Sequence, residues 1–172
     1  MAITPDAKDW TWVLERKCPE CGFEAGGLTP HDVAERVGAT LPRWDAALSR
    51  DDVLERPDPS TWSPLEYGCH VRDVFELFRK RLDLMLGADD ARFENWDQDA
   101  TALEKAYADA DPATVRAELA EQGAAARDAF AAVPVSAYGR RGLRSNGSEF
   151  TVVTLAQYFL HDVEHHLHDV RG

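Results

Sequence analysis

The stretch WSPLEYGCHVRDV, residues 62–74, decides the fold because it begins an amphipathic helix with a complete start signal. Ser63 is a preferred N-cap residue, Pro64 occupies the first helical position, and Glu66 stands three residues after the cap, which predicts a capping box. Apolar residues then recur at helical spacing as far as Met85. A single apolar stripe of this kind is typical of a helix that packs in a bundle.

Three further segments carry helix start signals, namely Thr29-Pro30, Asp111-Pro112, and Thr151 or Thr154. Each is followed by apolar residues at helical spacing, so the chain predicts four amphipathic helices. Residues 88–110 are rich in acids and predict a long crossover that packs back on the bundle. The pair Asn146-Gly147 suits a type I′ turn, which favours a small hairpin before the last helix. We therefore expect an all-α four-helix bundle over residues 29–172, preceded by an N-terminal extension of residues 1–28.

The composition fits one acidic globular domain. The 172 residues are 44% hydrophobic with a formal net charge of −12, so the chain can bury a core and repels nucleic acid. No apolar run approaches the ~20 residues of a membrane-spanning helix, and the polar start does not resemble a secretory leader. Three cysteines do not make a disulfide framework, which suits a reducing compartment. We expect a cytoplasmic protein without nucleic-acid or membrane partners, and an apolar helix face could support a homodimer.

Four of the six histidines lie near the C-terminus, in the last predicted helix. At about 100° per residue, His165 lies about 40° from His161 and His168 about 20° on the other side, so these three share one face. His166 lies about 140° from His161 and points elsewhere. Two histidines at positions i and i+4 can bind one metal ion from a single helix. The alternative is a solvated helix end that interacts with the C-terminal dipole.

A metal site on the last helix needs a further ligand, and His70 is the strongest candidate. It lies one turn before Val74 and so beside the buried stripe of the second helix. Four-helix bundles build metal sites from side chains on facing helices in this way. A hydrogen-bonded core histidine is the alternative for His70 taken alone.

The motif at residues 62–74, followed about ninety residues later by His161-x-x-x-His165, resembles the DinB-like superfamily. The resemblance covers the chain from about Thr29 to its end. It implies an up-down-down-up bundle in which His70, His161 and His165 bind one divalent ion. It also implies a metal-dependent transferase that uses a low-molecular-weight thiol such as mycothiol or bacillithiol, although many members have no assigned reaction.

Three neutral imidazoles leave open coordination positions, where an ion can lower the pKa of a bound thiol. We expect zinc first and nickel or iron next, with a small-molecule thiol and an electrophile as substrates. Asp73, Glu164 and His168 are candidates to orient the ligands or to transfer protons. The same site could instead support a metal-dependent hydrolase or isomerase, and a closed set including His168 would indicate a non-catalytic metal-binding stress-response module.

The motif Cys18-Pro19-Glu20-Cys21-Gly22 is similar to half of a zinc ribbon, but the chain has no second C-x-x-C. The pair therefore predicts a possible separate site at Cys18 and Cys21, with zinc shared with another chain or with Cys69 and His31. A redox-active dithiol and simple packing are the alternatives. Cys69 should face about 100° away from its neighbour His70, which makes it a poor co-ligand.

Overall fold

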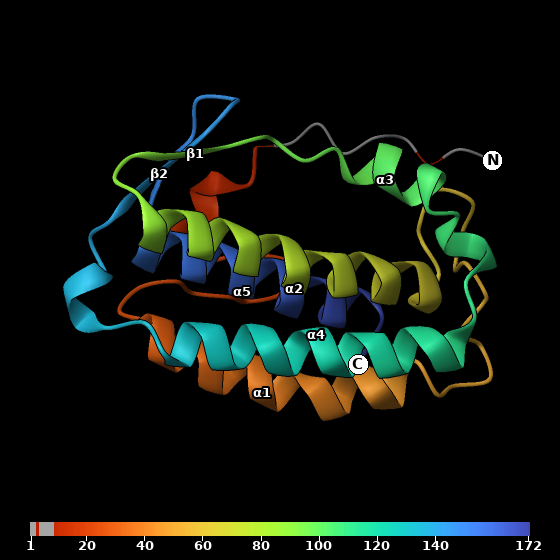
Figure 1. Cartoon of the computed structure of the whole chain (residues 1–172). Helices are drawn as coiled ribbons and strands as arrows, with labels where there is room; N and C mark the ends of the chain where they lie inside the picture. Colours follow the sequence, from red (N-terminus) through yellow and green to blue (C-terminus); the bar gives the residue numbers. More distant parts are fainter. Residues whose placement is uncertain (1–2, 4–8) are drawn as a thin grey trace.

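The computed structural model describes residue 3 and residues 9–172. Four long helices form the bundle, and they are α1 (Pro30–Ala47), α2 (Pro64–Gly87), α4 (Pro112–Ala131) and α5 (Val152–Asp169). Helix α1 packs on α4 and α5, and α2 packs on the same two helices, so α1 and α2 lie diagonally opposite. In Figure 1, α1 and α5 run in one direction while α2 and α4 run in the other. The predicted up-down-down-up bundle is therefore confirmed.

The helix starts follow the local signals. Thr29, Ser63 and Thr151 each form a capping box with the residue three positions later, and Asp111 caps α4 through its side chain. Pro42 lies inside α1 without ending it. These caps fix where each helix begins, because the side-chain oxygens satisfy backbone donors that the first turn leaves unpaired.

The aromatic centre of the core lies where α2, α4 and α5 meet. The ring of Phe159 on α5 stacks on Phe130 of α4 with centroids 4.9 Å apart, and it contacts Phe75 and Phe78 of α2 at 5.9 and 5.3 Å. All four rings are buried, as is Trp44 of α1. The aromatic centre holds α5 against α2, and this packing sets which residues of α5 face its neighbours.

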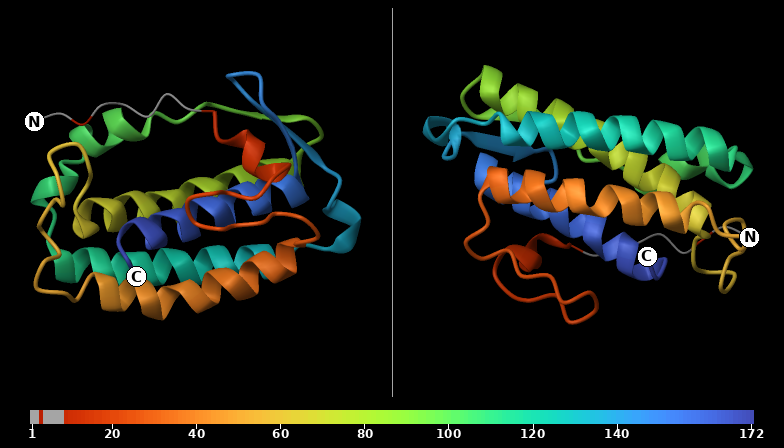
Figure 2. Two further views of the ribbon diagram at one scale, coloured as in Figure 1. Left: turned by 180° about the vertical axis from the view of Figure 1, so that it is seen from behind. Right: turned by 90° about the horizontal axis from the view of Figure 1, so that it is seen from below.

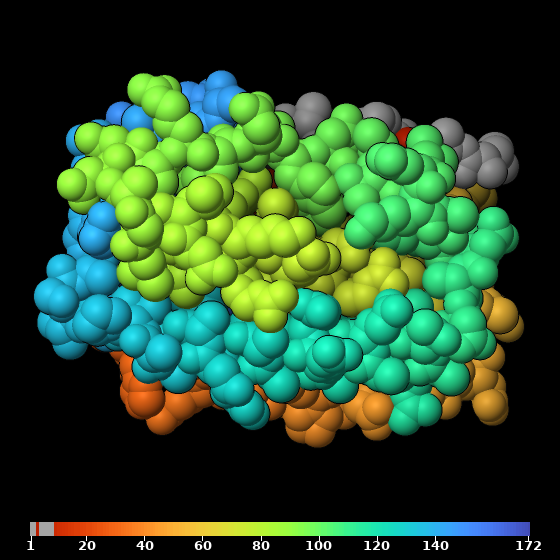
Figure 3. Space-filling view, viewed as in Figure 1, coloured from red at the N-terminus to blue at the C-terminus, as the bar shows by residue number. Residues whose placement is uncertain are grey.

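The crossover between α2 and α4 contains the strand β1 (Ala91–Phe93), the short helix α3 (Gln98–Glu104) and the turn η2 (Tyr107–Asp109). Figure 3 shows these residues, in green, along one edge of the molecular face formed by α2 and α4. The turn η3 (Val135–Ala137) leads to the predicted hairpin of β2 (Arg141–Arg144) and β3 (Glu149–Thr151). β1 pairs in parallel with β2, which pairs antiparallel with β3. The short sheet therefore ties the crossover to the start of α5.

The N-terminal extension contains the turn η1 (Thr11–Leu14), which contacts α5. Figure 2 shows the extension, in red and orange, looping beside α5. Val13, Cys18 and Phe23 of this segment are buried. The described part of the extension is therefore packed against the bundle. Among the described residues, no helix has the length and apolarity to cross a membrane.

Candidate metal centres

Three histidines of helix α5 belong to two neighbouring groups of metal-ligating side chains. We call His70, Asp162 and His166 the bundle centre, and Cys18, Cys21, His161 and His165 the extension cluster. Within each group, all the candidate ligand atoms lie within 4.8 Å of one another. The two groups interleave along α5, because Asp162 and His166 form one i, i+4 pair and His161 and His165 form another.

In the bundle centre, two imidazoles point at one carboxylate. Nε2 of His70 lies 3.0 Å from Oδ1 of Asp162, and Nε2 of His166 lies 3.6 Å from the same oxygen. Ligand atoms about 2.1 Å from a shared ion stand about 3.0 Å apart at right angles and about 3.4 Å apart in a tetrahedron. The donor spacing therefore fits a divalent ion, and His70 with Asp162 also makes a hydrogen bond at this distance.

Neighbouring groups set the orientation and protonation of the bundle centre. Nδ1 of His166 lies 2.9 Å from Oδ2 of Asp169, which directs Nε2 of the same ring toward Asp162. Burial lowers the pKa of His70, in spite of the nearby Asp162 charge. Burial acts to raise the pKa of Asp162, but the adjacent His70 and His166 outweigh it and hold that pKa below its ordinary value. Neutral imidazoles and an ionised carboxylate are the forms that bind metals.

The extension cluster has the composition of a tetrahedral zinc site. The Cys18 Sγ lies 3.7 Å from Nδ1 of His165. Cys18 is fully buried, and His161 and His165 are 4% and 6% exposed. A tight turn places the two cysteines, because the Gly22 amide donates to the Cys18 carbonyl at 2.9 Å and Gly22 adopts a φ of 79°. A left-handed φ of this kind favours glycine.

Burial governs protonation in the extension cluster. It lowers the pKa of His161 to about 4. Burial also raises the pKa of the Cys21 thiol to about 11, and the neighbouring Cys18 acts in the same direction. Without a cation the cluster therefore holds neutral imidazoles and a protonated Cys21, whereas a bound metal ion would draw the thiols into the thiolate form.

A cavity of about 320 Å³ borders both groups. Its walls carry the aromatic side chains of Trp10, Trp62, Tyr67 and Tyr158. They also carry the carboxylates of Glu20, Asp99, Asp162 and Asp169, and no lysine or arginine is among the described residues that line it. Since Asp162 and His166 are 23% and 17% exposed, an ion in the bundle centre could take a further ligand from the cavity.

The structure places the three histidines of the predicted metal site in two different groups. His70 belongs to the bundle centre, whereas His161 and His165 belong to the extension cluster. The physical reason is the rotation of α5 about its axis, which directs residues 162 and 166 toward α2 and residues 161 and 165 toward the extension. The single three-histidine site stays a prediction, and the donor geometry favours two separate groups.

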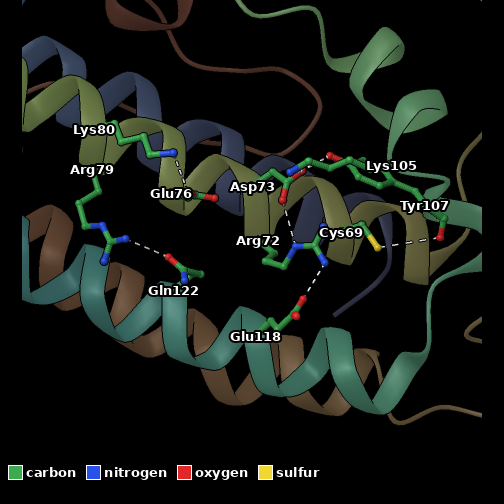
Figure 4. A network of polar contacts seen from close by, with 10 residues as sticks. All are labelled: Cys69, Arg72, Asp73, Glu76, Arg79, Lys80, Lys105, Tyr107, Glu118 and Gln122. Carbon is green, nitrogen blue, oxygen red and sulfur yellow. Dashed lines mark hydrogen bonds and ion pairs between the residues drawn. The ribbon is translucent and has the colours of Figure 1, made fainter.

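The other candidates have different surroundings. The Asp73 carboxylate accepts hydrogen bonds from Tyr107 Oη at 2.6 Å, Lys105 Nζ at 2.8 Å and Arg72 Nε at 3.0 Å, as Figure 4 shows. Glu164 forms a two-point ion pair with Arg36. Asp73 therefore anchors the crossover to α2, and Glu164 joins α5 to α1.

His168 and the spare zinc ligands also lie outside the two groups. His168 is exposed at the end of α5, although the helical wheel places it with His161. His31 is exposed and pairs with Glu35 at 3.6 Å. Cys69 is buried and its Sγ lies 3.9 Å from the Tyr107 carbonyl, so it is not a co-ligand of His70.

Sequence reasoning did not single out two sets of candidate ligands that the structure brings together, namely Asp162 with His166 and the histidine neighbours of Cys18 and Cys21. Both had a visible signal, because residues 162 and 166 are also spaced i, i+4, and C-x-x-C with H-x-x-x-H is a zinc-ligand pattern. The 139 residues that separate the two halves of the second pattern far exceed the usual zinc-finger spacing, which concealed it.

Fold and site together define a four-helix bundle with candidate metal ligands on facing helices. A family model described as the DinB superfamily matches residues 34–170, and the chain belongs to this superfamily. Its fold is similar to that of YfiT from Bacillus subtilis, described as a probable metal-dependent hydrolase with an unusual four-helix bundle topology. The TM-score is 0.70 at 18% identity, covering 81% of this chain and 82% of that chain. No curated protein gives a significant match.

Proposed function

We propose that this protein is a metal-dependent enzyme whose divalent ion is held by His70, Asp162 and His166. The observation that carries the proposal is the convergence of two imidazole nitrogens on Asp162 Oδ1 at 3.0 and 3.6 Å, beside the cavity. Two histidines and one carboxylate suit zinc, iron or nickel, and zinc is our first choice. A metal bound here would lower the pKa of a thiol or water molecule that reaches it from the cavity.

The preferred reaction is transfer of a low-molecular-weight thiol to an electrophile. The thiol loses its proton, its sulfur bonds to the electrophilic carbon, and the bond from that carbon to the leaving group breaks with its electron pair. The tryptophan and tyrosine walls offer apolar surface to the organic part of the substrates. Because the charged walls are acidic, they favour an uncharged or cationic thiol over one that carries carboxylates.

Hydrolysis is the second candidate reaction. The similar fold of YfiT, which is described as a probable metal-dependent hydrolase, favours it. It would use the same centre with water in place of the thiol. The bundle centre offers three protein donors and borders the cavity, which counts against a purely structural metal there, since structural zinc sites have four protein ligands.

The first test measures metal content and activity on tag-free protein. Elemental mass spectrometry is run on the natural protein and on the His70→Ala and Asp162→Ala variants, with His168→Ala as the exposed control. Thiol transfer is followed as the S-conjugate of mycothiol with monochlorobimane, and hydrolysis as 4-nitrophenol released from 4-nitrophenyl acetate.

We expect activity that depends on metal and is lost in His70→Ala and Asp162→Ala but kept in His168→Ala. Formation of the S-conjugate supports thiol transfer, and metal-dependent release of 4-nitrophenol alone supports hydrolysis instead. If the two ligand variants retain the metal content of the natural protein, the bundle centre is not a metal site and the proposal fails.

A further inference from the structure

We infer that Cys18, Cys21, His161 and His165 form a second metal site, a closed zinc site that fastens the N-terminal extension to α5. This site is distinct from the bundle centre and has no donor in common with it. The inference does not depend on the proposed function, because it concerns the architecture of the cavity wall whatever reaction occurs there.

The donor set and its geometry point to zinc. Two cysteines and two histidines are a standard structural zinc set, with Zn–S about 2.3 Å and Zn–N about 2.0–2.1 Å. Those bond lengths at a tetrahedral angle place sulfur and nitrogen about 3.6 Å apart. The observed distance between Cys18 Sγ and His165 Nδ1 is 3.7 Å. The remaining pairs lie within 4.8 Å, so side-chain shifts of about an ångström would complete a tetrahedron.

His161 supplies an independent observation. Its side chain is almost completely buried, with 4% exposed, and Nε2 has no hydrogen-bond partner among the described residues. A buried polar atom without a partner is rare in native proteins and calls for an explanation. The rings of Trp10 and Phe23 lie 5.6 and 5.3 Å from the His161 ring, and neither side chain has a nitrogen or oxygen acceptor for Nε2. A metal ion bound by the cluster provides the missing partner.

The surroundings of His165 complete the pattern. Its Nδ1 faces Cys18, while its Nε2 lies 3.4 Å from Glu20 and 3.8 Å from Asp169. A carboxylate on the ring nitrogen opposite the metal is the usual way in which proteins orient a histidine ligand. Charge is also balanced, because two thiolates neutralise one Zn²⁺, and a neutral cluster can be buried without an unpaired ion.

The site would give the extension a defined task. Glu20 lies between the two cysteines, and both Glu20 and Trp10 line the cavity. A zinc ion that fixes Cys18 and Cys21 on α5 would therefore hold Glu20 and Trp10 in the cavity wall. Loss of the ion should free this wall while leaving the four-helix bundle folded, because most of the buried core side chains belong to the four long helices and only a few, such as Cys18 and Phe23, come from the extension.

Cobalt binding tests the inference. Tag-free full-length protein is stripped of metal, kept reduced, and titrated with Co²⁺ while absorption is recorded. Thiolate ligation gives an intense near-ultraviolet charge-transfer band, and four-coordinate geometry gives strong visible bands. The bundle centre contains no sulfur, so of the two groups found among the described residues it is the extension cluster that produces the charge-transfer band. We expect this band to be complete by two equivalents, the number of proposed sites, to be displaced by Zn²⁺ and to be reduced to about half or less in Cys18→Ser or Cys21→Ser.

Two controls separate this site from the bundle centre. Cys69→Ser removes an equally buried cysteine outside the cluster and should keep the band, and Asp162→Ala should keep it as well. Zinc release should also speed tryptic cleavage after the exposed Lys17, compared with the zinc-loaded protein.

Absence of the band in the natural protein, or a disulfide between Cys18 and Cys21 in its place, overturns the inference. Equal intensity in Cys18→Ser and Cys21→Ser, with circular dichroism showing both variants folded, overturns it too. Loss of activity in Asp162→Ala with an unchanged charge-transfer band would support two separate sites.

Discussion

Replacing Tyr107 with phenylalanine should weaken the attachment of the crossover to α2. Tyr107 is 1% exposed, and its hydroxyl donates to Asp73 at 2.6 Å. Asp73 is itself 7% exposed and ionised, because burial raises its pKa less than the hydrogen bonds from Lys105, Tyr107 and Arg72 lower it. Tyr107→Phe removes one charge-assisted hydrogen bond and leaves Asp73 the two cationic partners that Figure 4 shows.

The expected cost follows from that contact. A hydrogen bond to a charged group contributes about 1.5–3 kcal/mol to the free energy of unfolding. In a chain of this size each kcal/mol changes Tm by about 2–4 °C, so Tyr107→Phe should lower Tm by about 3–12 °C. The effect should reach the bundle centre, because the crossover also carries Trp96, whose ring stacks 5.2 Å from His70.

Thermal and urea unfolding of the natural protein, Tyr107→Phe, Asp73→Asn and the double variant would measure the contact as a double-mutant cycle. Tyr138→Phe is the matched control, since Tyr138 is half-buried and the structure describes no hydrogen bond of its hydroxyl. A Tm for Tyr107→Phe within about 1 °C of the control would refute the reasoning, because a buried bond of this kind should cost more.

Three further predictions concern the metal centres, pH and packing. Asp169→Asn should lower the metal affinity of the bundle centre about 10–100-fold, measured by chelator competition with Asp128→Asn as an exposed control, because Asp169 orients His166. Burial acts to raise the pKa of Glu66, but the hydrogen bonds from Arg56 and Ser63 lower it by more, so the folded pKa lies below the ordinary value. The stability that ionised Glu66 gives to the folded protein is therefore present above the unfolded pKa of this residue, about 4.3, and is lost as pH falls through the lower folded pKa. Urea unfolding from pH 7 to pH 3 should thus show a smaller acid loss in Glu66→Gln, and an equal loss would contradict this. Gly123→Ala should lower Tm, because its Cβ would lie 2.4 Å from Leu41 and 3.0 Å from Phe75, and overpacking costs about 1–3 kcal/mol against about 1 kcal/mol of helix propensity. A higher Tm for Gly123→Ala would contradict this, because it would show that the Leu41 side chain moves away at little cost.

The local part of the fold was predictable from the sequence. The starts of α1, α2, α4 and α5 depend on capping side chains within three residues of each start, so Thr29, Ser63, Asp111 and Thr151 specify them without the rest of the chain. The hairpin was also expected from Asn146-Gly147, but its type I′ turn is wrong: the Gly147 amide donates to the Arg144 carbonyl at 2.9 Å, and of this pair only Gly147 has a positive φ, 94°. The parallel pairing of β1 with β2 was not predicted, because it joins segments about fifty residues apart and has no local signal.

The sequence by itself determined which residues of the last helix lie near one another. The i, i+4 spacing pairs His161 with His165 and Asp162 with His166 in any α-helix, whatever surrounds it. It could not determine which pair faces His70, because the two pairs differ by only about 100° and both lie beside apolar residues. The packing of the buried face of α5, with Phe159 against α2 and α4, fixes that rotation. The tertiary structure thereby brings Asp162 and His166 to His70 and leaves His161 and His165 for the cysteines of the extension.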